Sequence, residues 1–166
     1  MSETSFVYVT YIRTTPEKLW RALTTREFLA QYWEMGPAGV DPQVGSAVKW
    51  DMGQEVRDLG QVVLEAEPYR RLSYSWHNYQ WEWHEMFGWT EEQFAELVKE
   101  GCSKVTFDIE PAGSSVKLTV THDGFEPGSV MLTAVSGGWP QILASLKSLL
   151  ETGEPLTWSW APPAGG

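Results

Sequence analysis

The sequence predicts an α+β fold in which a curved antiparallel sheet wraps around one long C-terminal helix. Residues 116–122 alternate strictly between apolar and polar side chains, which is typical of a half-buried strand. The pair Asp123-Gly124 then provides a turn. After Ser129, apolar residues recur at helical spacing along one stripe, namely Val135, Trp139, Ile142, Leu143, Leu146, Leu149 and Leu150. An apolar helix face that meets an apolar sheet face suggests a binder of small apolar molecules.

The N-terminal part of the chain predicts one strand and two short helices. Residues 6–12 are mostly aromatic or β-branched, as strands prefer. Thr15 suits the N-cap of a helix and Pro16 its first turn, where no backbone donor is needed. The apolar face of this helix consists of Leu19, Trp20 and Leu23. A second short helix is expected from 26 to 32, before the Gly/Pro-rich residues 36–39 break the pattern.

Four further strands are expected, because short alternating segments are separated by turn residues. Their centres lie at residues 48–52, 61–65, 72–77 and 105–110. The turns carry glycine or proline at Gly53, at Pro68 and within 111–113. Short connections of this kind predict an antiparallel meander with one solvated side.

Residues 78–101 interrupt this meander as an insertion that packs aromatic side chains inward and presents acidic ones outward. The insertion holds six acidic residues and one lysine. Thr90 and Gln93 have capping-box spacing, so an extra helix is expected over about 90–100, ending at Gly101. We therefore expect a single domain over residues 1–155, followed by a Pro/Gly-rich tail over 156–166.

Composition excludes several classes of protein. The formal net charge of −10, without a lysine or arginine cluster, argues against binding to nucleic acid or to anionic lipid. No apolar run is long enough to span a membrane, and the N-terminus lacks the features of a signal peptide. A single cysteine, Cys102, suits a reducing compartment, so a cytoplasmic location is expected.

The order of these elements resembles that of the START-like (SRPBCC) helix-grip superfamily, which includes the birch-pollen allergen fold. More closely, the chain resembles the bacterial single-domain homologues of the heat-shock-protein-90 ATPase activator. The motifs that carry the resemblance occur in family order at 15–24, Gln31-Tyr32-Trp33, 70–76, 118–125 and Gly137-Gly138-Trp139. The resemblance implies a cavity between the sheet and the long helix, which in other members holds lipids, hormones or polyketide intermediates.

The inward faces of the predicted elements supply the candidate ligand-binding residues. These are Trp33, Trp50, Met52, Tyr74, Trp76, His122, Val135 and Trp139. The alternative is a filled core, because aromatic residues at alternating spacing usually pack against one another. His122 is the inward residue that could donate to a ligand or change its charge near neutral pH, and the alternative is a structural histidine.

No catalytic residue, metal site or cofactor is expected. His77 and His84 lack the spacing of a zinc site, and no phosphate loop or nucleophile elbow occurs. Pro140 should kink or restart the long helix. Gly137 and Gly138 allow close approach to the sheet, and the alternative is a hinge that admits ligand beneath the helix.

Three hypotheses about function follow. The first is a non-enzymatic module that binds a small hydrophobic molecule, and the second is an enzyme that uses His122 as acid–base in the same cavity. The third is a chaperone-associated or stress-response interaction module that uses the acidic insertion. The aromatic insertion either covers the cavity or packs a homodimer.

Overall fold

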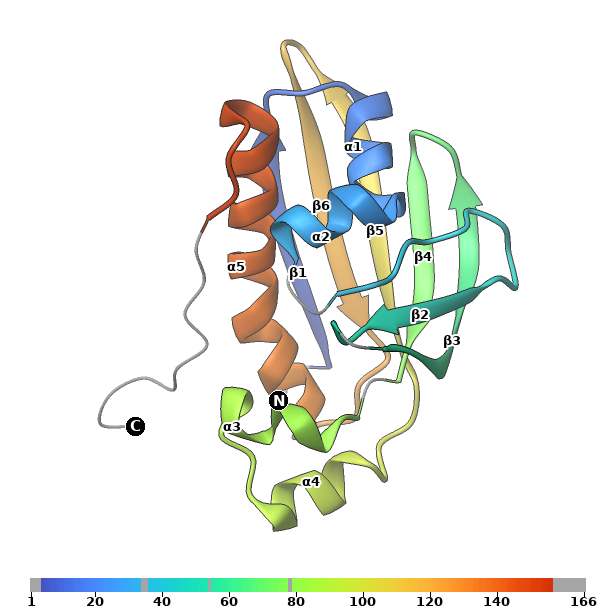
Figure 1. Ribbon diagram of the computed structural model, residues 1–166, viewed down its shortest axis with the longest axis vertical. Coiled ribbons are helices and arrows are strands. Elements are labelled where there is room, and N and C mark those ends of the chain that lie inside the picture. Colours follow the sequence, from blue (N-terminus) through green and yellow to red (C-terminus); the bar gives the residue numbers. More distant parts are fainter. Residues whose placement is uncertain (1–3, 34–35, 54, 78, 157–166) are drawn as a thin grey trace.

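The computed structural model describes residues 4–33, 36–53, 55–77 and 79–156. One six-stranded antiparallel sheet, in the order β1-β6-β5-β4-β3-β2, curves around the long C-terminal helix α5 (Figure 1). This is the predicted α+β helix-grip fold. The strands are β1 Ser5–Ile12, β2 Ala47–Asp51, β3 Val56–Glu67, β4 Arg71–Trp76, β5 Ser103–Ala112 and β6 Ser115–Asp123.

The helices lie between β1 and β2, between β4 and β5, and at the C-terminus. They are α1 Pro16–Thr24, α2 Arg26–Tyr32, α3 His84–Phe87, α4 Glu91–Leu97 and α5 Val130–Thr152, with a 3₁₀ turn η1 at Trp81–Trp83. Thr15 caps α1 by accepting a hydrogen bond from the Lys18 backbone N–H at 3.2 Å. The expected apolar face of α1 is buried, as predicted.

The two halves of the sheet differ in regularity. The β1–β6 and β5–β6 ladders keep one register throughout. The β2–β3 ladder shifts between Ala47 and Lys49, and the β3–β4 ladder shifts between Val63 and Glu65. Such irregularities bend a strand and increase its twist, so the sheet curves most strongly around β3. This half of the sheet carries three of the eight predicted site residues, Trp50, Tyr74 and Trp76.

The insertion leaves the sheet after β4 and returns at β5, and Figure 1 places α3 and α4 beyond the sheet, near the N-terminal end of α5. The capping box at Thr90 and Gln93 is present with both hydrogen bonds. This helix, α4, is shorter than predicted: it ends at Leu97, whereas the sequence predicted an end at Gly101. The Glu100 carboxylate instead accepts a hydrogen bond from the Val130 backbone N–H at 2.9 Å, which joins the insertion to α5.

The sequence predicts that α5 kinks or restarts at Pro140; a restart is wrong, because α5 is a single unbroken helix, and a kink stays a prediction. Proline removes one backbone donor, but buried residues on both sides of Pro140, including Trp139 and Ile142, hold the helix against the sheet. A Cβ atom at Gly137 would meet nothing within 4 Å, so close approach does not explain that glycine. Gly138 is buried.

Within the part of the chain that the structure describes, no helix is long and apolar enough to cross a membrane. Among these same residues, no group of three or more histidine, cysteine, aspartate or glutamate side chains could hold a metal ion.

Candidate functional site

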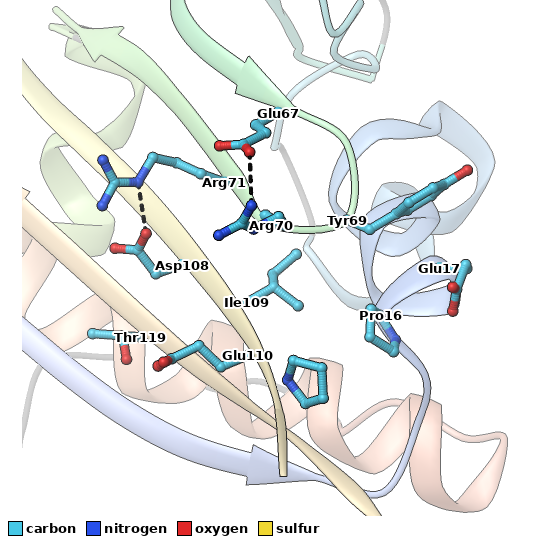
Figure 2. Close-up of a pocket in the computed structure, with 11 residues that line it drawn as sticks. Pro16, Glu17, Glu67, Tyr69, Arg70, Arg71, Asp108, Ile109, Glu110 and Thr119 are labelled. Carbon is cyan, nitrogen blue, oxygen red and sulfur yellow. Dashed lines mark hydrogen bonds and ion pairs between the residues drawn. The ribbon is translucent and has the colours of Figure 1, made fainter.

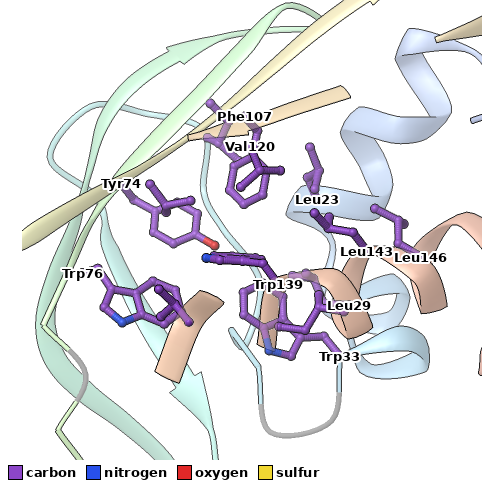
Figure 3. Packing of buried hydrophobic residues seen from close by; sticks show 14 of the residues in the cluster. Leu23, Leu29, Trp33, Tyr74, Trp76, Phe107, Val120, Trp139, Leu143 and Leu146 are labelled. Carbon is purple, nitrogen blue, oxygen red and sulfur yellow. The ribbon is translucent and has the colours of Figure 1, made fainter. Parts of the chain in front are cut away.

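Tryptophan side chains from separate elements meet on the concave face of the sheet, between its β2–β4 half and α5. We call this group the tryptophan cluster, and it consists of Trp33, Trp50, Trp76, Trp83 and Trp139. Neighbouring ring centroids lie between 5.1 Å (Trp50–Trp76) and 6.4 Å (Trp50–Trp83) apart. These are contact distances for aromatic rings. Figure 3 shows the rings of Trp33, Trp76 and Trp139 close to one another beneath the sheet.

Gly36 fixes the position of Trp33 at the C-terminal end of α2. A Cβ atom at Gly36 would lie 2.6 Å from Cγ of the Trp33 ring, so only glycine fits beside it. The Gly36 carbonyl also accepts a hydrogen bond from the Asp51 backbone N–H at 2.8 Å. The loop after α2 is thereby attached to β2, and Trp33 is pressed against Trp50, with ring centroids 5.7 Å apart.

His122, on β6, lies beside the tryptophan cluster and is fully buried. Its Nδ1 accepts a hydrogen bond from the Trp139 indole N–H at 3.1 Å. Since an indole nitrogen only donates, the proton of a neutral His122 must be on Nε2. Nε2 lies 2.9 Å from the Ser103 hydroxyl, which can accept this proton and donate onward to the Trp76 carbonyl.

Burial lowers the pKa of His122 to about 3, so the imidazole is neutral at physiological pH. Both ring nitrogens are occupied by protein partners. His122 therefore orients Trp139 and closes a hydrogen-bond chain, and its geometry fits the structural role that the sequence left open.

Several buried polar atoms near the cluster have no hydrogen-bond partner among the residues that the structure describes. The indole nitrogens of Trp50, Trp76 and Trp83 are unpaired, and so are both the oxygen and the nitrogen of the Gln61 amide. Gln61 is 0% exposed. Buried polar groups are nearly always hydrogen-bonded, because an unpaired one costs about 1–3 kcal/mol. This concentration of unpaired groups is the most unusual chemical feature of the described core.

The register of the sheet places Gln61 next to the cluster. Val63 on β3 pairs with Tyr74 on β4, and the Val62 backbone N–H donates to the Ser75 hydroxyl at 2.9 Å. Gln61 and Trp76 are the next residues beyond this contact on their strands, so we expect them to lie near each other. Both side chains are buried on the same face of the sheet.

The structure brings together five of the eight predicted site residues through direct ring contacts. They are Trp33, Trp50, Trp76, His122 and Trp139. Tyr74 joins them through Phe107, whose ring centroid lies 5.8 Å from the rings of Tyr74 and Trp139. Val135 is buried on α5, and Met52 is half-buried just beyond β2. Ligand binding by all eight stays a prediction.

Sequence reasoning missed Trp83, Phe107, Ser103 and Gln61 as members of this site. Trp83 lies in the insertion, whose aromatic side chains were expected to pack inward, and it is buried against Trp50. The alternation in β3 placed Gln61 on the same face as Val63, which could have identified it as a buried polar residue. The sequence does not indicate that Ser103 belongs to the site, because its role depends on His122, which lies in another strand.

A surface hollow at the other end of the sheet contains none of the predicted site residues (Figure 2). It lies between the start of α1, the β3–β4 turn and β5. Its two arginines are already paired: Arg70 with Glu67 at 3.1 Å, and Arg71 with Asp108 at 2.7 Å. Among the described residues that line it, the hollow therefore offers no unpaired cation for an anionic ligand.

Comparison with known proteins agrees with this architecture. A family model described as "Activator of Hsp90 ATPase homolog 1-like protein" matches residues 13–151. The crystal structure of protein MLL2253 from Mesorhizobium loti is 30% identical, with 88% of this chain and 96% of that chain covered and a TM-score of 0.67. No curated protein sequence matches the chain.

Two more distant structures show the fold alone. The solution structure of the Aha1 dimer from Colwellia psychrerythraea is 22% identical, covers 91% of this chain and 98% of that chain, and has a TM-score of 0.65. Protein EF2215 from Enterococcus faecalis is 16% identical, with 94% of this chain and 77% of that chain covered and a TM-score of 0.68. Because the family model spans most of the sequence and the fold agrees, the chain belongs to the family of Activator of Hsp90 ATPase homolog 1-like proteins.

Proposed function

We propose that this protein binds a small, mainly apolar molecule at the tryptophan cluster, between the β2–β4 half of the sheet and α5. The observation that carries the proposal is the group of unpaired polar atoms within an otherwise aromatic core. A core selected only for packing would fill these positions with side chains that have no polar atoms. A ligand would contribute the missing hydrogen-bond partners and bury further apolar surface.

The rings of the cluster are already in contact, so binding requires some of them to move. Trp33 follows the short helix α2, and Trp83 ends the three-residue turn η1. Trp50, Trp76 and Trp139 are held within strands or within the long helix. Because Gly36 fixes Trp33 against Trp50, we assign Trp83 as the ring that moves to admit the ligand. Apolar burial would supply about 25 cal/mol per Å², less the entropy costs of association.

The first test compares the native mass of gently purified protein with its mass after denaturation. We expect a reproducible extra mass of small-molecule size. Val135→Glu should abolish it, because a carboxylate would enter the buried face of α5. Gln141→Glu, at an exposed position on the same helix, is the matched control and should retain it. An empty wild-type protein that also fails to bind apolar probes would contradict the proposal.

An enzymatic role for His122 gains no support from the geometry. A general base must reach a substrate proton, whereas His122 is enclosed by Ser103, Trp76 and Trp139. We therefore favour a binding protein over an enzyme that uses this residue.

We also propose that the chain forms a homodimer through the sheet edge formed by β1, where the Tyr11 carbonyl already accepts a hydrogen bond from Lys147 at 2.6 Å. This strand ends the sheet, and its side chains Val7, Val9 and Tyr11 are 56%, 47% and 52% exposed. No charged residue occurs in Ser5–Ile12, so two copies can pair antiparallel without like charges facing each other. A more distant protein of the same fold is itself described as a dimer.

Light scattering coupled to size exclusion tests the dimer. Wild-type protein should have twice the chain mass, and Val9→Lys should shift it to the monomer because edge lysines oppose strand pairing. Val44→Lys, at a loop position that is 70% exposed, should leave the mass unchanged. A wild-type monomer at high protein concentration would exclude this interface.

A further inference from the structure

We infer that Gln61, together with the indole N–H groups of Trp50 and Trp76, forms a polar end of the ligand site. The site takes an uncharged, mainly apolar molecule that carries a hydroxyl or amide group, rather than a pure hydrocarbon or an anion. This inference rests on the proposed function and specifies the chemistry of its ligand.

The unpaired atoms belong to neighbouring side chains. Gln61 and Trp76 are the next residues beyond the Val62–Ser75 hydrogen bond on their respective strands, and the rings of Trp76 and Trp50 are 5.1 Å apart at an interplanar angle of 84°. Each of these three side chains is more than nine-tenths buried. The Trp83 ring extends the group, with its centroid 6.4 Å from that of Trp50.

The unpaired atoms define what a ligand must offer. The indole nitrogens and the amide nitrogen of Gln61 donate, so they need an acceptor oxygen. The amide oxygen of Gln61 accepts, so it needs a donor. A hydroxyl or an amide supplies both, whereas a hydrocarbon supplies neither and would leave all of these groups unpaired.

The surroundings favour an uncharged ligand. Arg57 lies opposite Trp50 in the β2–β3 register, but its guanidinium already pairs with Glu55 and donates to the Gln80 side chain at 2.8 Å. His122 is neutral and has both nitrogens occupied. A buried anion would therefore lack a compensating charge from these two groups, and uncompensated burial of charge is costly.

This arrangement predicts that replacing Gln61 stabilises the ligand-free protein but weakens ligand binding. In the ligand-free protein, Gln61→Met replaces an unpaired amide with an apolar side chain of similar length, so the Tm should rise. Gln80→Met is the matched control, because Gln80 is buried but bonded to Arg57, and its Tm should fall. A fall in Tm for Gln61→Met would show that the amide is satisfied without a ligand and would overturn the inference.

Binding is measured by equilibrium dialysis with 2-naphthol and 2-methylnaphthalene, which differ by a hydroxyl in place of a methyl group. We expect the wild type to bind 2-naphthol about tenfold more tightly, a difference of about 1.4 kcal/mol. Gln61→Met should reduce this preference to about twofold or less by weakening 2-naphthol binding. Gln141→Met, at an exposed position of α5, should leave both affinities unchanged.

The remaining outcomes separate the two proposals. Equal affinity of the wild type for both probes would overturn the inference about the polar end but leave the proposed function intact. A preference that survives Gln61→Met would overturn the assignment to Gln61. Failure of both probes to bind would overturn the proposed function and, with it, the inference.

Discussion

His122 is the buried titratable residue whose environment is most fully defined. The indole N–H of Trp139 donates to Nδ1, and the Ser103 hydroxyl lies 2.9 Å from Nε2, so one neutral tautomer is satisfied at both nitrogens. A protonated ring would place a second N–H against the Trp139 donor. The hydrogen bonds and the burial therefore act in the same direction, against the charged form.

This environment predicts that acid destabilises the protein through His122. The pKa is about 3 in the folded protein but near 6.5 in an unfolded chain, so between these values the unfolded state binds more protons. Above about pH 6.5, His122 makes its full contribution to the free energy of unfolding. As the pH falls toward 3, this contribution decreases by up to about 1.4 kcal/mol per pH unit. Chemical denaturation at pH 7.5, 6.0 and 5.0 measures this loss.

His122→Gln provides the comparison for the acid effect, because carboxylates also contribute to acid unfolding. The variant should be less stable than the wild type at pH 7.5, since it cannot serve both Trp139 and Ser103 in the same geometry. The difference between the two proteins should narrow as the pH falls. If the free energies of unfolding of the two proteins change with pH by the same amount across this range, His122 does not resist protonation.

At the scale of secondary structure, α5 depends on a residue that lies outside it. Glu100 accepts hydrogen bonds from the backbone N–H of Val130 at 2.9 Å and from the Ser129 hydroxyl, while Ser129 caps the helix through Leu132. A carboxylate at a helix N-terminus pairs free N–H groups and interacts favourably with the helix dipole. The insertion is thereby anchored to the helix that closes the fold.

Glu100→Gln should therefore destabilise the protein by about 1 kcal/mol, because it removes the charge and one acceptor oxygen from the cap. The measurement is the free energy of unfolding in denaturant at neutral pH. Glu96→Gln is the matched control, since Glu96 is exposed and pairs with Lys99 alone. It should change stability by less than about 0.5 kcal/mol. If the two variants lower the free energy of unfolding equally, Glu100 does not stabilise the N-terminus of α5 in this way.

The elements that the sequence predicts well are those whose pattern is local. Alternation located five strands, the aromatic and β-branched composition of 6–12 located the first, and the stripe from Val135 to Leu150 identified the buried face of α5. The short helix α3 and the turn η1 were missed, because four- and three-residue elements carry no periodicity. The end of α4 was predicted too late, since Glu100 serves α5 instead of extending its own helix.

In the candidate site, too, the sequence predicted the features that have a local pattern and missed those that do not. Alternation predicted that Trp50, Tyr74 and Trp76 face inward, and all three are buried. The hydrogen bond between His122 and Ser103 depends on strand register, which a local pattern does not specify.

In the whole molecule, the sheet has a regular half and an irregular half. The β1–β6–β5 ladders run without a register shift. The β2–β3 and β3–β4 ladders each contain a shift, and this half also carries the unpaired Gln61 and Trp76. Local opening is easiest where backbone pairing is interrupted and buried groups are unsatisfied. Stability should therefore decrease across the sheet from β6 toward β2.

Hydrogen exchange read by mass spectrometry should reveal this difference and its link to the site. Without ligand, amides of β5 and β6 should exchange most slowly, and those of β2 and β3 faster. Saturation with 2-naphthol should slow exchange in β2, β3 and β4 and leave β6 unchanged, because a ligand that pairs Gln61 and Trp76 removes the weakness of that half. Equal slowing of every strand would indicate general stabilisation, and slowing confined to β1 would place the probe at the sheet edge. Protection confined to the irregular half would show that its unpaired groups are maintained for binding, at the expense of stability.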